Sequence, residues 1–163
     1  VAAFLFGLGE TRASIPGVVI AAFAVGGLFY TMSVSRLLPR FGVKALMIGG
    51  SVVVTLQLLA VAAGPRWEVQ ALCFLLMGWG FYCLHGSLQV FSSELAPEAR
   101  ASALSLHAFC FFMGQAAGPI VYGFALEQAG KVSTLGFNAG VVLVLGVIAA
   151  RLLNRKPEAA AGS

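Results

Sequence analysis

Five apolar stretches without a charged side chain follow one another along the chain. Each is about 19 to 26 residues long, close to the ~20 residues with which a helix crosses ~30 Å of hydrocarbon. The alternation of apolar and polar positions that a membrane barrel requires is absent. The pattern therefore predicts membrane-spanning helices at about residues 14–36, 44–64, 68–93, 102–127 and 132–153.

Composition supports an all-α, polytopic membrane protein. Hydrophobic residues make up 60% of the chain, charged residues 10%, and the mean hydropathy is +0.94. Because a soluble domain has roughly a quarter charged residues, an ordinary water-soluble globule is excluded. Residues 1–156 are expected to form the membrane domain and residues 157–163 a disordered tail. The apolar but short run at 1–8 suggests the end of a preceding span, and hence a piece of a longer protein.

Basic residues alternate between the two sides of the predicted helices. One side holds Arg36, Arg40, Lys44, Arg100, Arg151, Arg155 and Lys156, and the other holds Arg12, Arg66 and Lys131. The positive-inside rule places the first set, and the C-terminus, in the cytoplasm. The net charge of +4 does not indicate nucleic acid, because the basic residues form no stripe with stacking aromatics.

The chain offers little for enzyme chemistry. Cys73, Cys83 and Cys110 lie inside predicted spans without metal-ligand spacing, and His85 and Ser87 are two residues apart on a helix, so they point to different faces. We therefore expect no enzyme activity, no metal and no cofactor.

The loop after the first span has a recognisable pattern, SRLLPRFGVK from Ser35 to Lys44. It resembles the loop motif G-x-L-x-D-R-x-G-R-K of the major facilitator superfamily, which it matches at Leu37, Arg40, Gly42 and Lys44. It departs from that motif at Ser35, Pro39 and Val43. The alternative interpretation is a basic loop that only sets orientation, with Gly42 turning a hairpin.

The boundary between the third and fourth spans resembles spans ten and eleven of bacterial major facilitator efflux permeases. Pro97, Glu98 and Arg100 match the P-E-x-R turn of those proteins. Pro97 suits the start of a short interfacial helix, and Ser102 and Ser105 are candidate caps for the next helix. The resemblance extends over essentially the whole chain and implies spans eight to twelve, and the end of seven, of a C-terminal six-helix bundle.

Two further features admit a structural and a functional interpretation. Glu94 is a candidate latch partner for Arg40 at the cytoplasmic face, or a solvated helix end. In the fourth span, small residues four apart predict close helix packing, with a bend at the proline. These residues are Gly114, Gly118, Pro119 and Gly123.

Polar residues on one face of the third span are the best substrate-cavity candidates, because polar groups in a bilayer tend to face the protein interior. Trp79, Tyr82, His85 and Gln89 fall within ~120° of the helix circumference. The resemblance implies that spans eight, ten and eleven line the cavity, which adds Tyr30 and Gln115 and argues against Gln57 and Asn138. The alternative is an interhelical hydrogen-bond seam. His85 could bind a proton or stay neutral, and His107 is read as packing.

The resemblance implies an alternating-access secondary transporter, and within it the proton-coupled efflux of a drug or sugar. The alternatives are an uptake symporter and a non-transporting membrane sensor or scaffold. The expected partners are the lipid bilayer, a small-molecule substrate, protons and an N-terminal half of the same chain that would carry the coupling acid. The expected location is the bacterial inner membrane.

Overall fold

A computed structural model of the chain describes residues 14–64 and 66–152. These residues form helix α2 (Ser14–Ala62), helix α3 (Trp67–Leu95), the short 3₁₀ helix η1 (Pro97–Ala99) and helix α4 (Arg100–Leu152). No strand occurs among them, and α2, α3 and α4 are each long and apolar enough to cross a membrane. The predicted all-α membrane fold is confirmed.

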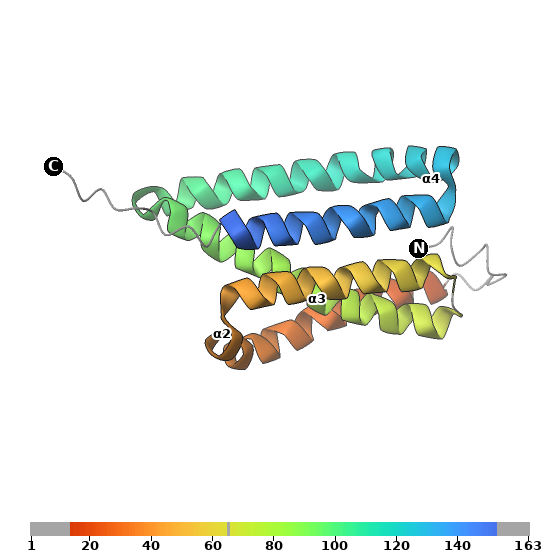
Figure 1. Cartoon of the computed structure of the whole chain (residues 1–163), viewed down its shortest axis with the longest axis horizontal. Coiled ribbons are helices and arrows are strands. Elements are labelled where there is room, and N and C mark those ends of the chain that lie inside the picture. Colours follow the sequence, from red (N-terminus) through yellow and green to blue (C-terminus); the bar gives the residue numbers. More distant parts are fainter. Residues whose placement is uncertain (1–13, 65, 153–163) are drawn as a thin grey trace.

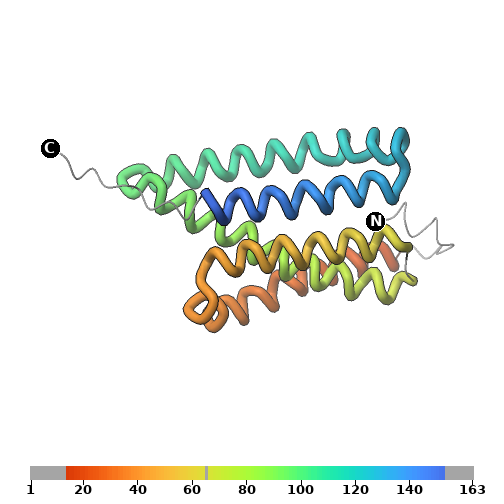
Figure 2. The backbone as a smooth tube through the Cα atoms, viewed as in Figure 1, coloured from red at the N-terminus to blue at the C-terminus, as the bar shows by residue number. Residues whose placement is uncertain are grey.

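Helices α2 and α4 are too long to be straight within a bilayer. They contain 49 and 53 residues, which as straight rods would measure roughly 75 to 80 Å, more than twice the hydrocarbon thickness. Each instead folds back on itself at one glycine, Gly42 in α2 and Gly130 in α4 (Figure 1). With α3, the two arms of α2 (14–41 and 43–62) and of α4 (100–129 and 131–152) make five antiparallel segments, whose order Figure 2 traces.

The turns are made by glycines because their backbone is left-handed. Gly42 and Gly130 both have φ of 74°, and Gly64, which ends the second arm of α2, has φ of 71°. Other residues meet their own Cβ in this region, whereas glycine does not. The turn at Gly42, given as one interpretation of the basic loop, is therefore present, and Gly64 and Gly130 make similar turns.

Substitution of Gly42 by alanine is expected to destabilise the hairpin by about 1 kcal/mol, because alanine is strained at positive φ. Nothing lies within 4 Å of a Cβ at Gly42, so the effect would be purely conformational. Thermal unfolding in detergent would measure it. Gly49→Ala is the matched control, since Gly49 is helical and equally open; an equal loss in both variants would contradict this explanation.

The connection between α3 and α4 is a tight turn. Pro97 opens η1, and the Ala99 N–H donates to the Ala96 carbonyl at 3.0 Å. The predicted short helix beginning at Pro97 is therefore confirmed. The predicted caps are wrong, because α4 already begins at Arg100 and Ser102 and Ser105 lie inside the helix.

Helices α2 and α3 approach each other at glycines. A Cβ at Gly50 would lie 2.5 Å from the Gly80 carbonyl oxygen, and one at Gly80 would lie 2.9 Å from that of Gly50. The two helices come close a second time at Gly26 and Gly78, where a Cβ on Gly26 would meet the backbone of Trp79. The helix backbones are therefore in direct contact where no side chain intervenes.

The second arm of α2 also packs on the second arm of α4. The Thr55 hydroxyl donates to the Ala139 carbonyl at 3.1 Å, so a polar side chain of one arm is satisfied by the backbone of the other. Towards the Gly64 end, Val61, Cys73 and Leu135 form a buried apolar cluster shared by α2, α3 and α4. The second arm of α4 is thus held against α2 and α3.

The exterior of the molecule is apolar. Leu28, Ile120 and Phe137 are 65%, 76% and 74% exposed, as suits side chains that face lipid or another helix. The first arm of α4 is the most open part, and a Cβ at Gly114, Gly118 or Gly123 would meet nothing within 4 Å among the described residues. Close packing of Gly114, Gly118 and Gly123 against another helix therefore stays a prediction, and that helix would lie outside the described residues.

The two ends of the bundle differ in charge. The turns at Gly42 and Pro97 and the end of α4 lie together at one end, and the turns at Gly64 and Gly130 lie at the other (Figure 1). The first end carries Arg36, Arg40, Lys44, Arg100 and Arg151, and the second carries Arg66 and Lys131. We call these the basic end and the opposite end.

Candidate functional site

An aromatic cluster runs across the bundle from α2 over α3 to α4. Its rings lie within 4.5 to 6.4 Å of a neighbouring ring, centroid to centroid. We define it as Phe23, Tyr30, Phe81, Tyr82, His85, His107 and Phe111.

The α2 side of the cluster is built on two tyrosines. Tyr30 stacks on Tyr82 with ring centroids 6.2 Å apart and planes 23° apart. Glycines make the room for both rings, since a Cβ at Gly27 would lie 2.5 Å from the Tyr82 ring and one at Gly86 would lie 2.6 Å from the Tyr30 hydroxyl oxygen. The predicted candidates Tyr30 and Tyr82 are thus neighbours.

The α4 side is built on His85. Its imidazole stacks on Phe81 at 5.3 Å with planes 9° apart, and lies 4.5 Å from the Phe111 ring of α4. The His107 ring, also from α4, is 5.4 Å away. His85 therefore joins α3 to the otherwise open first arm of α4.

The remaining cavity candidates lie outside the cluster. The Trp79 indole N–H donates to the Ser33 hydroxyl at 3.2 Å. This contact between α3 and α2 fits the alternative interpretation, in which the polar face of the third span forms hydrogen bonds to neighbouring helices. Gln89 and Gln115 are exposed and form no side-chain hydrogen bond with any described residue. Gln115 borders a shallow hollow of about 410 Å³ beside Phe111 and Gly114.

Four members of the cluster were not among the predicted cavity residues: Phe23, Phe81, Phe111 and His107. The available signal was spacing, since Phe81 and His85 on one helix, and His107 and Phe111 on the other, are four residues apart and share a face. His107 was interpreted as packing, and its ring lies 5.4 Å from that of His85.

The predicted gate residues lie at the basic end. The Arg40 guanidinium sits over the Phe41 ring at 5.6 Å, and Lys44, Glu94, Glu98 and Arg100 are exposed. Arg40 and Glu94 are not paired in this conformation, whereas Arg66 and Glu68 form an ion pair at the opposite end, at 3.1 Å. The latch remains a prediction for another conformation.

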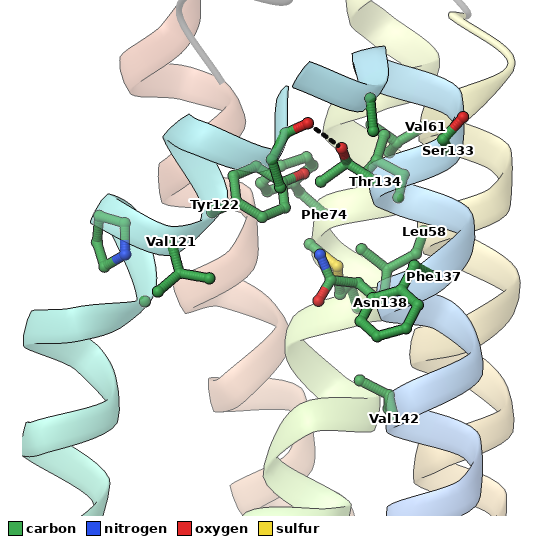
Figure 3. A pocket seen from close by; sticks show the side chains of 16 residues that line it. Leu58, Val61, Phe74, Val121, Tyr122, Ser133, Thr134, Phe137, Asn138 and Val142 are labelled. Atoms are coloured by element: carbon green, nitrogen blue, oxygen red, sulfur yellow. Dashed lines mark hydrogen bonds between the residues drawn. The ribbon is translucent and has the colours of Figure 1, made fainter. Parts of the chain in front are cut away.

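A cavity of about 980 Å³ opens near the Gly130 turn, between the arms of α4 and the facing parts of α2 and α3 (Figure 3). Its wall is mainly apolar, with Leu58, Phe74 and Phe137 among the lining residues. The Thr134 hydroxyl is already used, because it donates to the Ala125 carbonyl at 3.0 Å (Figure 3). Asn138, predicted to be peripheral, lines this cavity. A wall with few free polar groups gives a solute little orientation, so we take the aromatic cluster as the candidate site.

The described residues give no sign of metal chemistry. Within 14–64 and 66–152, no group of three or more His, Cys, Asp or Glu side chains could hold a metal ion. Cys73 and Cys83 are buried and unpaired, and Cys110 is exposed.

Comparison with known proteins gave one match. A family model described as Major Facilitator Superfamily matches residues 2–163. No curated protein and no solved structure matches the chain.

Proposed function

Because the chain belongs to the major facilitator superfamily, a family of secondary transporters of small solutes, we propose that it serves the proton-coupled efflux of a small organic molecule such as a drug or sugar. The observation that carries the substrate class is the aromatic cluster. A stacked ring pair contributes ~0.5 to 1.5 kcal/mol in addition to the free energy of burying its surface. A ligand with a flat apolar face would therefore gain binding free energy from each exposed ring. Tyrosine hydroxyls and imidazole nitrogens would orient it.

The position of the cluster suits alternating access. Tyr82 lies near the middle of α3, and His85 lies about 15 Å from its Leu95 end at ~1.5 Å per residue. A site at this depth can open to either side when two halves rock about it. In our proposal the other wall of the cavity comes from an N-terminal half of the same protein.

The charge difference between the ends supports an orientation. Five basic residues at the basic end against two at the opposite end favour a cytoplasmic basic end by the positive-inside rule. The C-terminus would then be cytoplasmic, in a bacterial inner membrane. Arg40, Lys44, Glu94, Glu98 and Arg100 would lie where a cytoplasmic gate closes.

The direction of coupling can be tested in inside-out membrane vesicles containing the complete protein. An interior made acidic by ATP hydrolysis should drive accumulation of a planar aromatic dye or a radiolabelled disaccharide, because efflux antiport exchanges internal protons for the solute. Collapse of the pH gradient should abolish accumulation. Accumulation only under the reversed gradient would favour the uptake symporter, and equal retention in vesicles lacking the protein would favour a sensor or scaffold.

A further inference from the structure

One wall of the cavity near the Gly130 turn is a row of residues on a single face of α4. Its lining residues on the first arm include Gly118, Tyr122, Ala125 and Ala129, which are three or four positions apart. From Tyr122 to Ala129 this wall is about 10 Å long at ~1.5 Å per residue. In a membrane, small residues four apart let a second helix approach closely. The wall therefore has the spacing of a helix-packing surface.

The other walls of the cavity are also helical and mainly apolar. They include Leu58 of α2, Phe74 of α3 and Phe137 of the second arm of α4 (Figure 3). A peptide backbone that enters hydrocarbon must satisfy its own hydrogen bonds, which a helix does. A peptide that fills this space would therefore be an apolar helix.

The start of α2 lies beside the cavity. Ile15 and Val19, in the first two turns of α2, form a buried cluster against which Phe74 packs, and Phe74 is also a cavity wall. Ser14 begins α2 at the opposite end of the bundle, where the Gly130 turn also lies (Figure 1). The five residues 9–13 can bridge about 17 Å when extended. The chain that precedes them is therefore tethered within reach of the cavity.

The segment before this linker matches the cavity in polarity, length and spacing. Residues 1–8 read VAAFLFGL and contain no polar side chain. Eight residues in a helix measure about 12 Å, close to the length of the α4 wall. Ala3 and Gly7 are four apart, as are Ala125 and Ala129. Gly9 follows the segment, and glycine is the residue type found most often just after a helix end.

We propose that the apolar segment 1–8 binds in this cavity as a helix, with Ala3 and Gly7 against the first arm of α4. It would enter from the opposite end of the bundle, antiparallel to the first arm of α2. Small residues bring two helix backbones into contact, whereas a lipid chain gains nothing from their spacing, so the segment is the better occupant. It would hold in place the arm of α4 that carries Phe111 of the aromatic cluster.

Photo-crosslinking of the complete protein in lipid nanodiscs tests the proposal. Replacement of Phe137 by p-benzoylphenylalanine puts a photoreactive ring on the cavity wall, and we expect mass spectrometry to find adducts with residues 1–8. Phe124 is the matched control, because it is also on α4, is 64% exposed against 74% for Phe137, and is not a lining residue. The same replacement at Phe124 should give no adduct with residues 1–8. Since both rings are exposed, neither replacement disturbs a packed core.

A pair of leucine variants tests the contact itself. Ala3→Leu should lower the yield of the Phe137 adduct severalfold, because the larger side chain would separate the segment from α4. Ala2→Leu makes the same change about 100° round the helix and should leave the yield unchanged. Equal yields from the two variants would contradict the contact.

Adducts of position 137 with phospholipid or with a second copy of the chain, in place of residues 1–8, would overturn the proposal, as would equal adducts from positions 137 and 124. These results do not depend on the leucine variants or on transport. Loss of the proposed efflux activity would therefore leave this helix contact standing, and a lipid adduct would leave the proposed function standing.

Discussion

Substitution of Gly50 by valine is expected to prevent α2 and α3 from packing. Even the first added carbon would lie 2.5 Å from the Gly80 carbonyl oxygen and 2.8 Å from Cys83 Cβ. Overpacking a core usually costs ~1 to 3 kcal/mol, and here the obstacle includes backbone, which cannot rotate away. We expect a loss of about 3 kcal/mol or more, measured as loss of the monodisperse peak in size-exclusion chromatography and a large fall in Tm.

The neighbouring residue supplies a matched control. Gly49 is in the same helix, and a Cβ there meets nothing within 4 Å. Gly49→Val has the same change in helix propensity and hydrophobicity, so the difference between the two variants isolates the α2–α3 contact. Equal behaviour would mean that the two helices do not touch at Gly50.

Substitution of Tyr82 by alanine should weaken substrate binding about tenfold or more, on the order of 1.4 kcal/mol. The Tyr82 ring contacts Tyr30, Phe23 and Phe81, so its removal eliminates a stacking surface and loosens its neighbours. Tyr82→Phe keeps the ring and should stay within about threefold. Binding of a planar aromatic dye, followed by fluorescence anisotropy, would give both values.

A second variant distinguishes the aromatic cluster from the larger cavity. Phe137 lines the cavity near the Gly130 turn and is distant from the cluster in sequence. Phe137→Ala should leave dye affinity unchanged. If Phe137→Ala weakens binding and Tyr82→Ala does not, the cavity of Figure 3 is the binding site and the cluster is structural.

The all-α membrane fold and the turn at Gly42 could be predicted because each depends on local chemistry. Apolar runs of bilayer length place the helices, and a left-handed backbone requires glycine at Gly42 and Gly130. The shared face of Tyr82 and His85 was also predictable, since helical phase follows from spacing alone. These predictions needed no knowledge of which helices are neighbours.

The contacts between helices could not be predicted in the same way. Small residues show that a close approach is possible, not where it occurs: the sequence favoured the row at Gly114, Gly118 and Gly123, whereas the described contacts use pairs such as Gly50 and Gly80. The contacts of His107 could not be predicted for the same reason, because they are made with His85 and Ser92 of another helix.

The two hairpin turns have different consequences for biosynthesis. Arg40 and Lys44 flank Gly42, so this turn would carry two positive charges through the hydrocarbon if it were translocated. Glu127 and Lys131 flank Gly130, and their charges cancel. In the proposed orientation, the neutral turn is the one that crosses the bilayer while the protein is inserted. The two arms of α4 can therefore enter the membrane as a preformed hairpin. The electrostatic cost is lower than it would be for the α2 hairpin if the Gly42 turn had to cross the bilayer.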